Sequence, residues 1–62
     1  MTVSEARRLL APETAPLVRR EILGRYEDPV EGAIEYRRKH TEAVSVAVKA
    51  LERWERWEDD GR

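Results

Sequence analysis

Few side chains in this sequence could take part in catalysis. There is one histidine, His40, no cysteine, and only two serines, Ser4 and Ser45. A serine nucleophile needs a neighbouring base to activate it, so any such pair would have to use His40. A chain of 62 residues also has little room for a substrate pocket, which has a volume on the order of several hundred Å³. We therefore expect that the protein is not an enzyme.

Metal-ligating side chains are equally sparse. The common structural zinc sites use cysteines and histidines together, and the sequence holds only His40. The helical carboxylate–histidine motif places Glu three residues before His, but that position is Arg37. The adjacent carboxylates of Asp59 and Asp60 supply too few oxygens for a hard cation, which takes about six or more. We predict neither a metal nor a cofactor.

Basic side chains are concentrated in three arginine pairs, Arg7–Arg8, Arg19–Arg20 and Arg37–Arg38, the last followed by Lys39. Arginine contacts phosphate, so such pairs can mark a nucleic-acid surface. However, the chain holds 12 basic and 13 acidic side chains, and the acidic ones are interleaved with the basic. We interpret the pairs as solvated helix faces with local ion pairs. The alternative is a small DNA-binding regulator whose contacts come from Arg19, Arg20, Arg37, Arg38 and Lys39.

The composition indicates a small folded protein that needs help to be stable. Hydrophobic residues make up 40% of the chain, which is too many for a disordered tail. A chain this short buries only about 60% of its unfolded surface. Without disulfides or a metal, oligomerisation is the remaining usual source of stability. No apolar run reaches a membrane span or a signal peptide, so we expect a cytoplasmic protein without a membrane partner.

Capping signals and prolines predict two short helices in the first half of the chain. Thr2 and Glu5 have the spacing of a capping box, and Pro12 ends the helix that this box starts. Thr14 is the predicted N-cap of the next helix, since Pro16 then falls in its first turn, where proline is tolerated. These signals place the helices at about residues 3–10 and 15–24.

The strongest start signal precedes a long third helix. Asp28 is the predicted N-cap, Pro29 the first helical residue and Glu31 the partner in a capping box. We expect this helix over about residues 29–58, followed by a frayed polar end over 58–62. At 1.5 Å per residue the helix would be roughly 45 Å long. The sequence therefore predicts one all-α domain, residues 1–62, with two short helices packed on one long C-terminal helix.

Two apolar stripes run along this long helix. The first is centred on Val44 and includes Val48 and Leu51, and we expect it to face the chain's own short helices. An amphipathic helix needs only one such stripe, so the second indicates a contact with another chain, unless the short helices wrap around this half of the helix. In this second stripe we expect Val46, Ala50 and Trp57 to point outward, with Trp54 at the border. The predicted protein-binding residues are Ala43, Val46, Ala50, Trp54 and Trp57.

These observations favour a protein-interaction module over the DNA-binding alternative. We predict self-association through the third helix, most simply as a two-fold homodimer, together with binding to another protein. Small helical proteins of this kind are frequent among accessory and phage-encoded genes. The excess of arginine over lysine, 10 to 2, also hints at a GC-rich bacterial or phage genome.

Overall fold

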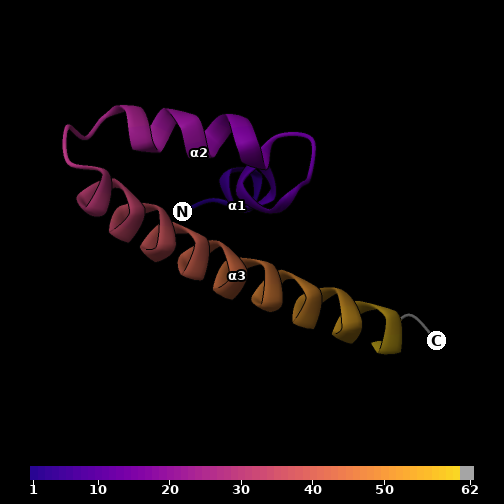
Figure 1. Cartoon of the computed structure of the whole chain (residues 1–62). Coiled ribbons are helices and arrows are strands. Elements are labelled where there is room, and N and C mark those ends of the chain that lie inside the picture. Colours follow the sequence, from indigo (N-terminus) through magenta and orange to yellow (C-terminus); the bar gives the residue numbers. More distant parts are fainter. Residues whose placement is uncertain (61–62) are drawn as a thin grey trace.

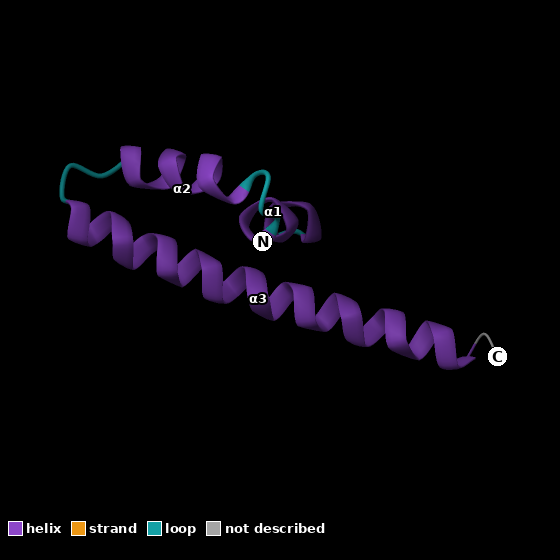
Figure 2. Cartoon of the chain, turned by 45° about the vertical axis from the view of Figure 1, so that its right-hand side comes forward, coloured by secondary structure: helices purple, strands orange, loops and turns teal. Residues whose placement is uncertain are grey.

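The protein folds as three helices, as the sequence predicts. The computed structural model describes residues 1–60. Helix α1 covers Val3–Leu10, α2 covers Ala15–Gly24 and α3 covers Pro29–Asp60. The described part of the chain has no strand, and both short helices pack on the long C-terminal one (Figures 1 and 2). Helix α3 continues two residues past its predicted end, and residues 61 and 62 of the predicted frayed end lie outside the described residues.

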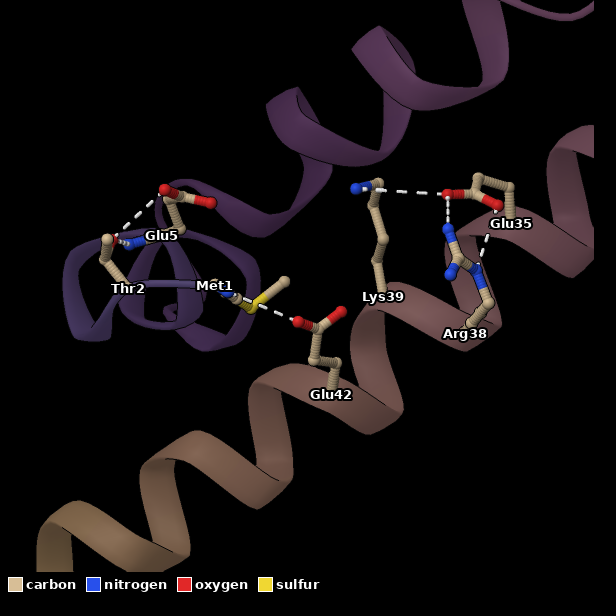
Figure 3. Close-up of polar contacts among 7 residues, drawn as sticks. All are labelled: Met1, Thr2, Glu5, Glu35, Arg38, Lys39 and Glu42. Carbon is tan, nitrogen blue, oxygen red and sulfur yellow. Dashed lines mark hydrogen bonds and ion pairs between the residues drawn. The ribbon is translucent and has the colours of Figure 1, made fainter.

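Helix α1 begins at the cap that its sequence predicts. The Thr2 hydroxyl oxygen accepts a hydrogen bond from the backbone N–H of Glu5 at 3.1 Å, and the hydroxyl donates to Glu5 Oε1 at 3.3 Å (Figure 3). Ala11 has extended backbone angles, φ −71° and ψ 131°, because a residue before proline avoids the helical region. The helix therefore ends at Leu10.

Thr14 is the N-cap residue of α2, as predicted, but it does not cap the helix with its side chain. Its backbone is already helical, with φ −111° and ψ −23°, and its side chain makes no cap hydrogen bond. The hydroxyl instead donates to the carbonyl oxygen of Arg8 at 2.7 Å. The last carbonyls of a helix lack partners within it, so this bond satisfies one of them. Thr14 thereby holds the end of α1 against the start of α2.

The start of α3 depends on one carboxylate. Asp28 Oδ1 accepts a hydrogen bond from the backbone N–H of Val30 at 2.9 Å. We expect Asp28→Ala to lower the free energy of unfolding by about 1 kcal/mol, the usual loss for a missing N-cap. Urea denaturation followed by circular dichroism measures this loss, and Asp28→Asn, which keeps an acceptor, should lose less. Equal stability of wild type and Asp28→Ala would show that the start of α3 does not need this cap.

The core is small and lies where the short helices meet the middle of α3. Its buried members are Ala6 and Leu9 of α1, Ile22 of α2 and Ala43 of α3. Around them pack the half-buried side chains of Leu10, Val18, Tyr36 and Val46. In Figures 1 and 2, α2 runs beside the N-terminal half of α3, and α1 crosses near its middle.

Small residues on α3 let the short helices approach closely. A Cβ atom added at the buried Gly32 would lie 3.1 Å from Leu23 Cδ2, so α2 passes directly over this glycine. Ala43 has no exposed surface under α1. The Met1 amino group also lies 3.3 Å from Glu42 Oε1, which joins the start of the chain to α3 (Figure 3).

The predicted orientation of α3 is wrong. Ala43 is 0% exposed and Val46 packs against the core, so this stripe faces the short helices instead of pointing outward. Val44 and Val48 are 42% and 47% exposed, on the opposite side. The buried cluster joins Leu9 and Ile22 of the short helices to Ala43 of α3, and close approach of helices is easier over such small residues than over a row of valines.

Candidate protein-binding surface

The molecule exposes much more surface than a compact chain of its size. Its extents are 52 × 19 × 14 Å and its radius of gyration is 14.5 Å, against about 10.6 Å for a compact domain of this length. The accessible surface is 5375 Å² for 7.3 kDa, whereas the usual scaling gives about 4,200 Å². The excess, roughly 1,200 Å², is larger than the roughly 800 Å² that one partner buries in a standard protein interface.

Much of this surface lies on the side of α3 that faces away from the core. Eight exposed residues there are spaced alternately by four and three positions, which is the heptad spacing of a coiled-coil seam. We call this set the outer stripe, and it consists of Val30, Ile34, Arg37, Thr41, Val44, Val48, Leu51 and Glu55. At about 100° per residue the stripe lies roughly 130° around the helix from Gly32 and Ala43. The outer stripe therefore lies mainly on a different face from the one that α1 and α2 cover, and only Leu51 also lines the groove beside α1.

Beyond the short helices, the C-terminal arm of α3 carries two exposed tryptophans. Residues 51–60 are all exposed, and this arm extends past both short helices in Figures 1 and 2. The rings of Trp54 and Trp57 lie 5.1 Å apart between centroids, and Trp54 Nε1 donates to Glu58 Oε1 at 2.9 Å. The two rings thus pack on each other at the surface, where aromatic side chains often serve as contact points for a partner.

The structure separates the five predicted protein-binding residues. Ala43 is fully buried, so no partner reaches it without displacing α1. Val46 and Ala50 are half-buried, and Ala50 lines an apolar groove of about 410 Å³ between α1 and α3. Of the five, only Trp54 and Trp57 are exposed, at 57% and 66%. Their part in binding stays a prediction.

The basic residues on α3 do not form one patch. Arg37, Arg38 and Lys39 are consecutive, so their side chains leave the helix about 100° apart. Arg38 Nη2 lies 2.6 Å from Glu35 Oε1, and Lys39 Nζ lies 3.9 Å from the same oxygen (Figure 3). The hydrogen bond from Arg38 lowers the pKa of the Glu35 carboxyl, and the same bond raises the pKa of Arg38. Two of the three cations are therefore already paired with a carboxylate.

The predicted basic residues of α2 lie against an aromatic ring of α3. The Arg19 guanidinium carbon is 5.7 Å from the centre of the Tyr36 ring, in cation–π geometry. Arg19 and Arg20 both line a shallow depression of about 730 Å³ that also includes Tyr36. Arg37, in contrast, lines a separate depression with Val30. The structure thus brings Arg19 and Arg20 together and leaves Arg37 apart from them.

Comparisons with known proteins give no match. The sequence matches no family model, no curated protein and no solved structure. The surface described above is therefore interpreted from its own geometry.

Other kinds of site find little support in residues 1–60. No three metal-ligating side chains come together there, and His40 packs its ring 6.1 Å from that of Tyr36. No helix among these residues is long and apolar enough to cross a membrane.

The exposure of the outer stripe was not predicted from the sequence. The sequence interpretation grouped Val44, Val48 and Leu51 correctly as one apolar face, but assigned that face to the core. Periodicity also places Arg37 on this face, where a charge does not suit a core, whereas Glu55 was left out of it. The alternating spacing of four and three residues is the signal that would have shown a seam for a second helix.

Proposed function

We propose that this protein is a small helical protein-interaction module that binds through the outer stripe of α3 and self-associates there. One observation carries the proposal. The large apolar side chains of the stripe are Val30, Ile34, Val44, Val48 and Leu51. They lie at heptad positions, which a coiled coil buries, yet they are between 42% and 66% exposed. Single exposed apolar residues are ordinary, whereas five of them on one face of one helix are typical of an interaction surface.

The energetics support association through this row. Burying one Val, Leu or Ile side chain completely is favourable by about 1.5–3 kcal/mol, and five such side chains lie along one straight helix. The N-terminal half of α3 is held by α1 and α2 (Figure 2), so a partner meets an already ordered helix and less conformational entropy is lost on binding. As a setting we propose the cytoplasm of a bacterium, for an accessory or phage-encoded protein, on the arginine-rich composition alone.

Sedimentation equilibrium tests the proposal, on the wild type and on a double variant, Val44→Ser with Val48→Ser. We expect a wild-type dimer at micromolar concentration and a variant that is monomeric but still helical. Leu17→Ser is the matched control, because Leu17 is also exposed but lies on α2, and it should dimerise like the wild type. A wild type that stays monomeric at high micromolar concentration would remove self-association from the proposal.

We expect the protein to bind duplex DNA only weakly and without sequence preference at physiological salt. The physical reason is the net charge of −1 and the pairing of Arg38 and Lys39 with Glu35. Fluorescence anisotropy with labelled duplexes measures the affinity, and any binding should fall steeply as salt rises. A sequence-specific nanomolar complex, lost on Arg19→Ala with Arg20→Ala, would instead support the DNA-binding regulator.

A further inference from the structure

Two charged residues interrupt the outer stripe at opposite ends of its apolar centre. Arg37 lies seven residues before Val44, and Glu55 lies seven residues after Val48. Within residues 1–60 neither Arg37 nor Glu55 makes an ion pair. A polar residue at a seam position costs stability but fixes the register and orientation of the partner helix. These two charges therefore restrict which helix can pack on the outer stripe, and in which direction and register.

We propose that a second copy of this chain covers the outer stripe, with the two α3 helices antiparallel and Arg37 of each copy opposite Glu55 of the other. The proposal rests on the proposed function and adds the occupant, its direction and its register. Antiparallel pairing that places Val44 opposite the partner's Val48 necessarily places Arg37 opposite the partner's Glu55, because both steps are seven residues. The two-fold symmetry then makes each of these pairings twice.

Other arrangements of two copies leave the charges unfavourably placed. A parallel dimer in register would bring Arg37 against the partner's Arg37, and Glu55 against the partner's Glu55, so that like charges repel along the seam. An antiparallel dimer shifted by one heptad would place Arg37 opposite the partner's Val48, or Glu55 opposite the partner's Val44. Either shift leaves a charge in the seam without an opposite charge.

The neighbouring residues fit this register. Thr41 falls opposite the partner's Leu51, so no further charge enters the centre of the seam. On one flank Arg38 is offset from the partner's Glu52 by about 3 Å along the helices, which adds an opposite-charge contact at the rim. The seam is centred on residues 37–55 of each copy, and at the two ends of the overlap Ile34 falls opposite the partner's Glu58. The short helices pack on the Gly32 and Ala43 side of α3, and of the stripe residues only Leu51 borders the groove beside α1.

Charge reversal tests the orientation. We expect Arg37→Glu and Glu55→Arg each to raise the dimer dissociation constant roughly tenfold or more, because two attractive pairs become repulsive. The double variant, Arg37→Glu with Glu55→Arg, restores opposite charges in the antiparallel dimer and should return close to wild-type affinity. In a parallel dimer each of these residues faces its own copy, so reversing its charge replaces one like-charge contact by another. Single variants that dimerise as tightly as the wild type would therefore overturn the proposal. Arg53→Glu is the control, because Arg53 is exposed but lies on the opposite side of α3 from the stripe.

Disulfide trapping gives a second, independent readout, since the chain has no cysteine of its own. Under mild oxidation a mixture of Thr41→Cys and Leu51→Cys should form a covalent heterodimer, because these positions face each other in the proposed register. Thr41→Cys alone should not, because the two copies of position 41 are about 15 Å apart along the helices. Efficient covalent dimers of Thr41→Cys alone would indicate parallel pairing and overturn the proposal.

The outcomes separate this inference from the function on which it rests. A wild type that is monomeric removes both self-association and its geometry. A wild type that dimerises, but whose dimer ignores both charge reversals, leaves the proposed function in place and overturns the antiparallel register alone.

Discussion

Val46→Glu is expected to detach α1 from α3, whereas Val48→Glu, two residues further on, should leave the fold intact. Val46 packs against the core beneath the short helices, so a glutamate there would bring an unpaired carboxylate among apolar side chains. Val48 is on the outer stripe and already meets water. Both changes replace the same residue in the same helix, so they alter helix propensity equally, and only the face differs.

We expect Val46→Glu to lower the free energy of unfolding by about 2 kcal/mol or more. For Val48→Glu the change in the monomer should stay within about 0.5 kcal/mol, while self-association is lost. Amide hydrogen exchange at low protein concentration measures the fold, through the protection of α1 backbone amides. Sedimentation at higher concentration measures association. If Val48→Glu removed the protection of α1 and Val46→Glu did not, the assignment of the two faces of α3 would be reversed.

Leu9→Ala is expected to cost about 3 kcal/mol of stability, the usual range for a buried leucine being about 2–5 kcal/mol. Leu9 is 4% exposed and is one of four buried core residues. A domain of this length has a total stability on the order of 3–9 kcal/mol, so one truncation removes a large fraction of it. A thermal melt followed by circular dichroism should show a markedly lower Tm.

Leu17→Ala is the matched control for this prediction. Leu17 is on α2 and is 57% exposed, so its truncation leaves no cavity, and alanine has a slightly higher helix propensity. We expect a change within about 0.5 kcal/mol. Similar losses in the two variants would contradict the small core described for residues 1–60.

The three-helix architecture was predictable because helix boundaries are set by local signals. The Thr2 cap, the break at Pro12 and the Asp28–Pro29 start each act on backbone within a few residues, and the structure shows the first and last as hydrogen bonds. The ion pair between Glu35 and Lys39 is local in the same way, being one helical turn apart. Thr14 shows the limit of such rules, because its hydroxyl caps nothing in α2 and donates to the carbonyl oxygen of Arg8, six residues away.

The faces of α3 were not predictable from the same rules. Periodicity gives the angle between two stripes on a helix, but it does not say which stripe meets the rest of the chain. Hydrophobicity favoured the valines for the core, yet Ala43 and Gly32 occupy the buried side. The distance between the helices decides which stripe is buried. Two helices approach more closely over small residues than over a row of branched ones, and so make more packing contacts.

The start and end signals of the helices were therefore sufficient to predict how many helices there are, how long they are and where they lie in the sequence. Hydrophobic periodicity was sufficient to predict two separate apolar stripes on the third helix. Tertiary packing alone determined that Ala43 and Val46 lie inside and that Val44 and Val48 lie outside. It also determined where the short helices lie along α3, so that the C-terminal arm of α3 extends past them (Figure 1). The physical reason is the distance over which each interaction acts. Capping and periodicity act within one or two helical turns, whereas the buried face of a helix depends on how side chains from distant segments fit together.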